Sequence, residues 1–317
     1  MYESFYKFKR APFSTVPDPG LLFLSPQHQR ALSLLEYAIL ARAGFCVVTG
    51  AVGAGKTTLV RRLLQKIERD LEIGLVSNTT CESFEELMQW ILLAFNLEYR
   101  GKQKVELYDT FVAFLIEQYK KGRPVTLIID EAQNLAPALL EQLRMLSNLN
   151  TEKGQLLQTI LIGQPNLWDL LRRPELEQFA QRISYDYFLG PMESSDLTGQ
   201  YIRHRLGAVG GDQGLFGEET YDMIWRATSG VPRLINLVCD TALVYGYAEQ
   251  LGRIDCRIVE QVLKDKEMSF SVVGGTAPPS DEAALLPNTD AKKPLRTRPP
   301  LVRSTIERAM LKLSDAK

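Results

Sequence analysis

A glycine-rich stretch in the first quarter of the chain restricts the possible folds more than any other feature. It has the sequence GAVGAGKT over residues 50–57, follows the β-branched run GFCVVTG and opens the helical pattern GKTTLVRRLLQKIERD. Glycines at 50, 53 and 55 permit the sharp backbone path of a phosphate-binding loop (P-loop). The N–H groups of such a loop, and of the helix after it, form a cradle for phosphates. This context predicts an α/β fold with a phosphate site.

The residues of the loop have distinct predicted roles. Lys56 is predicted to reach the β- and γ-phosphates of a nucleotide, and the Thr57 hydroxyl to ligate Mg²⁺. The predicted nucleotide-binding residues are Gly50, Ala51, Val52, Gly53, Ala54, Gly55, Lys56, Thr57 and Thr58.

Strand and helix patterns alternate up to about residue 190, and the strands are apolar on both faces. This alternation predicts a parallel sheet covered by helices on both sides. Helical patterns alone follow, so we predict an α/β core over residues 1–190 and an all-α lid domain over 191–267. The stretch 268–302 is rich in Gly, Pro and charge and predicts a disordered linker. Residues 303–317 predict a short amphipathic helix that begins with a capping box.

Paired carboxylates end a second strand, VTLIIDE. In a P-loop protein this strand should lie beside the P-loop strand, which would let Asp130 hold Mg²⁺ and Glu131 orient and polarise an attacking water. The pair favours hydrolysis over phosphoryl transfer to a small molecule. A third strand, ILIGQP, ends on Gln164. Its side chain is predicted to contact the γ-phosphate or the water, although a plain turn residue before a proline fits equally well.

Arginines at two places are further candidates. The segment RRPELEQFAQRI contains Arg172, Arg173 and Arg182. One of them is predicted to reach the active site of a neighbouring subunit, with Arg182 first and Arg173 second, and a surface salt bridge is the alternative for each. In GVPRLIN, Arg233 starts a helix, where the helix dipole disfavours a cation. Taken alone, the position is that of a surface arginine after the helix-starting Pro232.

Composition excludes several other classes. The 317 residues carry a net charge of −1, so no global field draws the chain to nucleic acid or anionic lipid. The four cysteines lack CxxC spacing and predict reduced thiols. The N-terminus lacks an apolar signal region, and no apolar run reaches the roughly eighteen residues of a membrane span. We therefore expect a cytoplasmic protein that reaches a membrane through a partner.

Together, the P-loop, the IIDE strand, the polar strand end, the arginines and the GxPR helix resemble the AAA+ ATPases. The resemblance implies a Mg²⁺-dependent ATP hydrolase that works as a ring or other homo-oligomer. It implies catalytic roles for Lys56, Glu131, Gln164, Arg182 and Arg233. Arg233 would be the "sensor 2" arginine, which reaches from the lid to the γ-phosphate, so the position of the lid would depend on that phosphate.

A closer resemblance extends over residues 5–266. The segments PFSTVPDPGLLFLSPQHQRALSLLEYAI, IIDEAQNL, ILIGQPNL and QRI are similar to the general secretion pathway protein A group, which includes pilus-biogenesis and exopolysaccharide-locus ATPases. Longer members carry a transmembrane helix and a peptidoglycan-binding domain, and neither pattern occurs in this sequence. We therefore expect the type that needs an inner-membrane partner, with the helix at 303–317 as a docking peptide or, alternatively, a frayed end.

Two other functions stay open at this point. A DNA-associated AAA+ regulator of transposition shares the compact architecture and the DEAQ strand end, and basic clusters at 61–69 and 102–123 would contact DNA. A nucleotide-binding switch that scarcely hydrolyses is disfavoured by Glu131. DNA-stimulated, salt-sensitive ATP hydrolysis would favour the first of these alternatives.

Overall fold

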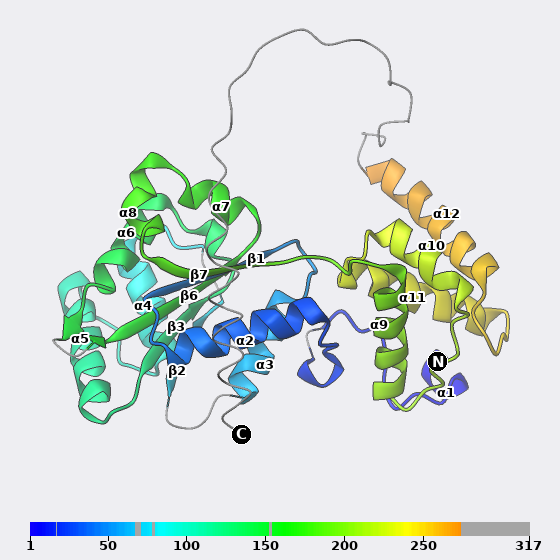
Figure 1. The fold of residues 1–317 in the computed structure, drawn as a ribbon, viewed down its shortest axis with the longest axis horizontal. Coiled ribbons are helices and arrows are strands. Elements are labelled where there is room, and N and C mark those ends of the chain that lie inside the picture. The colour runs from blue at the N-terminus through cyan, green and yellow to red at the C-terminus, as the bar shows by residue number, and fades with distance from the viewer. Residues whose placement is uncertain (17, 67–70, 78–79, 152–153, 274–317) are drawn as a thin grey trace, which may run out of the picture. The chain divides into compact units, whose positions relative to one another are not determined.

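A computed structural model describes residues 1–16, 18–66, 71–77, 80–151 and 154–273 (Figure 1). Within these residues five strands form one parallel sheet in the order β2-β3-β6-β1-β7. The strands are β1 (Phe45–Gly50), β2 (Glu72–Val76), β3 (Val125–Ile129), β6 (Leu157–Gly163) and β7 (Ile183–Leu189). The short strands β4 (Asn150–Thr151) and β5 (Gly154–Gln155) pair antiparallel. The α/β class expected from the sequence is confirmed.

Helices cover both faces of this sheet because successive strand residues point to opposite sides. In β1, Phe45 and Val47 pack into one buried cluster, and Cys46 and Val48 pack into the other. The first cluster lies under α4 (Phe84–Ala94), α5 (Lys104–Lys120), α6 (Pro137–Leu146), α7 (Asn166–Leu171) and α8 (Glu177–Ala180). The second lies under α2 (Pro26–Leu40) and α3 (Lys56–Lys66). The apolar strands are therefore buried on both faces.

The strand order corrects one expectation. The strand that ends in Asp130 and Glu131 does not lie beside the P-loop strand, because β6 pairs with both β1 and β3 and separates them. An apolar run shows that a strand is buried, but it contains no information on which parallel strand becomes its neighbour. As a result, Gln164, which follows β6, lies between the P-loop edge and the paired carboxylates.

The helical part contains α9 (Ser195–Ala208), α10 (Glu219–Thr228), α11 (Pro232–Ala248) and α12 (Cys256–Val273). The start of the chain, with α1 (Tyr2–Phe5) and the turn η1 (Pro19–Leu21), contributes Phe8, Phe13 and Leu21 to the same buried cluster. The Phe13 ring meets the Phe216 ring edge-on, with centroids 5.9 Å apart. These first residues therefore pack with the lid helices and not with the sheet.

The domain limits stay predictions, with two structural differences to note. The first is that the start of the chain, which we assigned to the core, packs with the lid helices. The second is that α12 continues to Val273, beyond the expected end of the lid at residue 267, because its helical pattern extends into the stretch assigned to the linker. The rest of the expected linker and the helix at 303–317 lie outside the described residues.

All four cysteines are free thiols, as expected from their spacing. Cys46, Cys81 and Cys239 are buried, and Cys256 is partly exposed. Among the described residues, every helix is too short or too polar to cross a bilayer.

Candidate functional site

The P-loop joins the end of β1 to the start of α3 in a backbone path that requires glycine. Gly53 and Gly55 have φ values of +82° and +98°, a region that side chains other than glycine rarely enter. A Cβ on Gly50 would lie 2.5 Å from the carbonyl oxygen of Leu189 on the neighbouring strand. The loop and the first turn of α3 thus leave a concave, glycine-lined backbone that fits a phosphate group.

Lys56 lies in the first turn of α3 with its side chain folded back into the loop. Its Nζ donates to the carbonyl oxygens of Gly50 (2.7 Å) and Ala51 (3.1 Å). Burial lowers the pKa of Lys56, and the charges of Glu131 and Asp130 oppose that shift. The Lys56 cation therefore lies in the loop that is predicted to hold phosphates, and two carboxylates are nearby.

Thr57 and Asp130 meet across the sheet edge. The Thr57 hydroxyl donates to Asp130 Oδ2 (3.1 Å), and the Glu131 N–H donates to Asp130 Oδ1 (2.9 Å). Asp130 is buried, which raises the pKa of its carboxyl, although both hydrogen bonds oppose that shift. A hydroxyl and a carboxylate oxygen are the hard donors that Mg²⁺ prefers. The pair therefore fits the predicted metal role.

Glu131 is held between two glutamine side chains. Gln133, in the turn η2 (Ala132–Asn134), donates through Nε2 to Glu131 Oε2 (2.6 Å), and Gln164 Nε2 donates to the same oxygen (3.3 Å). Gln133 Oε1 also accepts the Gln164 N–H (2.9 Å). The backbone of Glu131 is left-handed, with φ +53°, which is uncommon for a non-glycine residue. The predicted water-orienting carboxylate is thus fixed in direction.

A cavity of about 370 Å³ is lined by Lys56, Thr57 and Glu131 of the core and by Arg233 of the lid. The backbone N–H of Arg233 donates to the Gly53 carbonyl (3.2 Å). A Cβ on Gly53 would collide with the Arg233 Cβ. The structure therefore brings the start of α11 against the P-loop, where the arginine predicted from GVPRLIN faces the phosphate cradle.

The three candidate arginines of the core lie away from this cavity. Arg182 is half-buried, and its Nη1 donates to the hydroxyl of Ser147 (3.1 Å). Arg172 is exposed, and Arg173 is exposed with a distant contact to Glu175 (3.7 Å). Within the described part of the chain, the cavity lining includes none of the three arginines. This position agrees with a role on a neighbouring subunit, which stays a prediction.

His28 is a site residue that sequence reasoning missed. It is buried on α2, where Nε2 contacts the Ala54 carbonyl of the P-loop (3.1 Å) and Nδ1 contacts the Ser25 hydroxyl (2.7 Å). Because a carbonyl only accepts, Nε2 is the donor and Nδ1 accepts from Ser25, which defines a neutral tautomer. A lone histidine in a helix gives no signal in the sequence that it contacts a loop 26 residues away.

We expect His28 to make stability depend on pH. Burial lowers its pKa below the ordinary 6.5, so its contribution is complete above that value and is lost as pH falls through the folded-state pKa. In thermal unfolding, the loss of stability from about pH 7.5 to about pH 5.5 should be smaller in His28→Gln than in wild type. His204→Gln is the comparison variant: burial lowers the pKa of His204 too, so this variant should remove the contribution of His204 to the slope and keep that of His28. An unchanged slope in His28→Gln would contradict this assignment.

Comparison with known proteins fits this geometry. Residues 40–171, which include the P-loop and the carboxylates, match the family model described as AAA domain. The solved structure of ORC2 from Aeropyrum pernix aligns with a TM-score of 0.63 at 15% identity, over 81% of this chain and 71% of that chain. The RuvB Holliday junction branch migration motor of Thermotoga maritima aligns with a TM-score of 0.51 at 20% identity, over 75% and 68%. The α/β core therefore has the AAA+ fold that the sequence predicted. At these identities the structures establish the fold alone.

The chain is also similar to General secretion pathway protein A of Aeromonas hydrophila, with 39% identity over 255 residues. The alignment covers 80% of this chain and 46% of that protein, so the chain spans about half the length of this relative. The resemblance expected from the sequence is confirmed by this match.

Proposed function

We propose that this protein binds ATP with Mg²⁺ in the cavity at the P-loop and hydrolyses it as a homo-oligomer. One observation carries the proposal. Lys56, Thr57 and Glu131 from the core, and Arg233 from the lid, line one cavity of about 370 Å³. The cavity would supply the phosphate cradle, the Thr57 metal donor with Asp130 bound behind it, and the water-orienting carboxylate that phosphoryl transfer requires.

In this proposal each residue has a role that its position supports. The P-loop amides and Lys56 hold the phosphates, and Thr57 and Asp130 hold Mg²⁺, which would neutralise charge on the β- and γ-phosphates. Glu131 aims its carboxylate at the attacking water. Because Gln133 and Gln164 both donate to Glu131 Oε2, they orient that carboxylate.

The lid arginine and the predicted trans-acting arginine complete the proposal. Arg233 contacts the γ-phosphate from the lid, so hydrolysis weakens the attachment of the lid to the core. Arg182 of one subunit enters the cavity of the next, and Arg173 is the second candidate. Half-burial against Ser147 limits the rotamers of Arg182, which supports a defined direction for its guanidinium.

The first experiment measures ATP hydrolysis per subunit against protein concentration. We expect the rate to climb with concentration in the wild type and to fall by about 10³- to 10⁵-fold in Arg182→Ala. Arg226→Ala is the matched control, because Arg226 is 74% exposed on α10 and pairs with Asp222 of the same helix. A flat profile with an unaffected Arg182→Ala would mean that the active site is complete within one subunit.

Mixing two inactive variants tests whether Arg182 acts in trans. Arg182→Ala subunits keep Glu131, and Glu131→Gln subunits keep Arg182. If the arginine acts on the neighbour, the mixture forms interfaces with both groups intact and hydrolysis recovers. If Arg182 acts within its own subunit, the mixture stays inactive. The same mixing with Arg173→Ala tests the second candidate.

We further propose that the ATP cycle drives assembly of a secretion, pilus or polysaccharide-export system. The support is the similarity to General secretion pathway protein A, over the part that contains the site. The protein would act in the cytoplasm beside an inner-membrane partner, through the segment 303–317. Deleting that segment should release the protein from inner-membrane fractions and leave ATP hydrolysis unchanged.

A second candidate function is DNA-associated regulation, and one surface feature favours it. A cavity of about 370 Å³ is lined by Arg42, Lys120 and Arg123, of which Arg123 pairs with Glu72 (2.9 Å). These positively charged side chains have the chemistry that binds the phosphate backbone of DNA. ATP hydrolysis stimulated by duplex DNA, lost with salt and lost in Lys120→Glu, would support DNA-associated regulation. An unchanged rate would favour envelope assembly.

A further inference from the structure

Arg205 on α9 is a buried cation that the proposed reaction does not use. Its residue is 7% exposed, and its guanidinium donates to the carbonyls of Pro12 (2.6 Å) and Ser14 (3.0 Å). Within the described residues, no carboxylate forms an ion pair with it. A buried charge without a counter-ion disfavours folding unless its hydrogen bonds are satisfied. Here the backbone of residues 12–16, which we call the strap, satisfies them.

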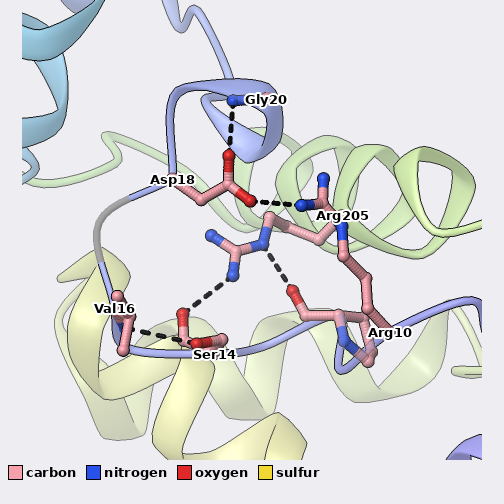
Figure 2. A network of polar contacts seen from close by, with 7 residues as sticks. Arg10, Ser14, Val16, Asp18, Gly20 and Arg205 are labelled. Atoms are coloured by element: carbon pink, nitrogen blue, oxygen red, sulfur yellow. Dashed lines mark hydrogen bonds and ion pairs between the residues drawn. The ribbon is translucent and has the colours of Figure 1, made fainter.

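The strap borders the nucleotide cavity at a place separate from the P-loop. Ser14, Thr15 and Val16 line this cavity together with Asp18. Figure 2 shows Arg205 directed at the strap, and Asp18 bound to Arg10 and to the N–H of Gly20. The P-loop and α3 account for the phosphates, so the strap faces the nucleoside part of the ligand.

A chain of hydrogen bonds joins the strap to the helix that carries Arg233. Arg205 Nη1 donates to the Tyr201 hydroxyl (3.3 Å), and that hydroxyl donates to Asn236 Oδ1 on α11 (2.6 Å). Asn236 lies three residues after Arg233, and both line the cavity. The strap, α9 and α11 are therefore connected through side chains that are nearly completely buried.

We propose that Arg205 is a positioning residue for the nucleoside moiety of ATP. Arg205 fixes the strap to the lid. The part of the cavity that would hold the base and ribose is therefore held rigidly relative to α11, the helix that carries Arg233. This inference rests on the proposed ATP site. It predicts that Arg205 affects binding of a nucleoside triphosphate and leaves binding of the triphosphate group alone unaffected.

Calorimetric titration with ATP and with inorganic tripolyphosphate tests this separation. Arg205→Met should weaken ATP binding by at least about tenfold and change tripolyphosphate binding by less than about twofold. Arg205→Lys should recover part of the ATP affinity. The lysine ammonium keeps the positive charge, but it lacks the planar guanidinium whose N–H groups reach the carbonyls of Pro12 and Ser14 together. The matched control is Arg226→Met on α10, which should bind both ligands as wild type does.

Several outcomes would overturn the proposal. ATP affinity within about twofold of wild type in Arg205→Met would remove the positioning role, and equal losses for ATP and tripolyphosphate would indicate a general defect. If Arg205→Met unfolds, Tyr201→Phe tests the same chain, since it removes only a hydroxyl. A wild-type protein that binds neither ligand would instead refute the ATP site itself, for which Lys56→Ala provides the reference.

Discussion

Replacing Glu131 with glutamine is expected to lower the rate of ATP hydrolysis by about 10²- to 10⁴-fold while ATP binding is retained. The substitution keeps the length and shape of the side chain, but an amide has no negative charge with which to polarise a water. Gln133 and Gln164 would still hold the group, because the amide oxygen accepts from their Nε2 atoms as the carboxylate does.

The measurement is phosphate release at saturating ATP, together with the dissociation constant of ATP by calorimetry. Glu98→Gln is the matched control, because Glu98 is exposed and accepts a hydrogen bond from the nearby N–H of Arg100 (3.0 Å). A Glu131→Gln rate within about threefold of wild type would assign water orientation to another group.

Replacing Gly53 with alanine is the second substitution with a large expected effect. A Cβ at this position would collide with the Arg233 Cβ, and φ at Gly53 is +82°. The P-loop would therefore shift, or α11 would move away from it and break the hydrogen bond from the Arg233 N–H to the Gly53 carbonyl (3.2 Å). Either change should weaken ATP binding by about ten- to a hundredfold.

Gly101→Ala separates the collision from backbone strain. Gly101 has φ +72°, and an added Cβ there would meet nothing within 4 Å. Each variant should lose about 1 kcal/mol of the free energy of unfolding from the left-handed backbone, and Gly53→Ala should lose more because of its collision. Only Gly53→Ala should lose ATP affinity. Equal ATP affinity in the two variants would show that ATP binding does not depend on the close contact between Gly53 and Arg233.

The local chemistry of the site could be predicted from the sequence, because its residues form short contiguous motifs. The P-loop places Lys56 and Thr57 by backbone geometry alone, and Asp130 and Glu131 follow a strand whose end has to meet the same sheet edge. Arg233 is predicted from the resemblance of its GxPR helix start to AAA+ ATPases, and the structure places its backbone against the P-loop. These positions depend on few residues outside each motif.

Contacts between distant segments could not be predicted in the same way. The position of β6 between β1 and β3 depends on which parallel strands associate, and an apolar run is compatible with any neighbour. His28 contacts a loop from α2, and Arg205 contacts residues more than 190 positions earlier in the chain. A single histidine or arginine has no spacing pattern that reveals such a partner.

The packing of Phe8, Phe13 and Leu21 with α9 to α12 has a consequence for synthesis of the chain. The ribosome produces these apolar residues before the α/β core, and their partners on α9 to α12 after it. During that interval the core can fold as a unit, but the beginning of the chain has no surface to bury its aromatic rings. The lid is thus assembled from the two ends of the described chain, and it becomes complete only when α12 has been made.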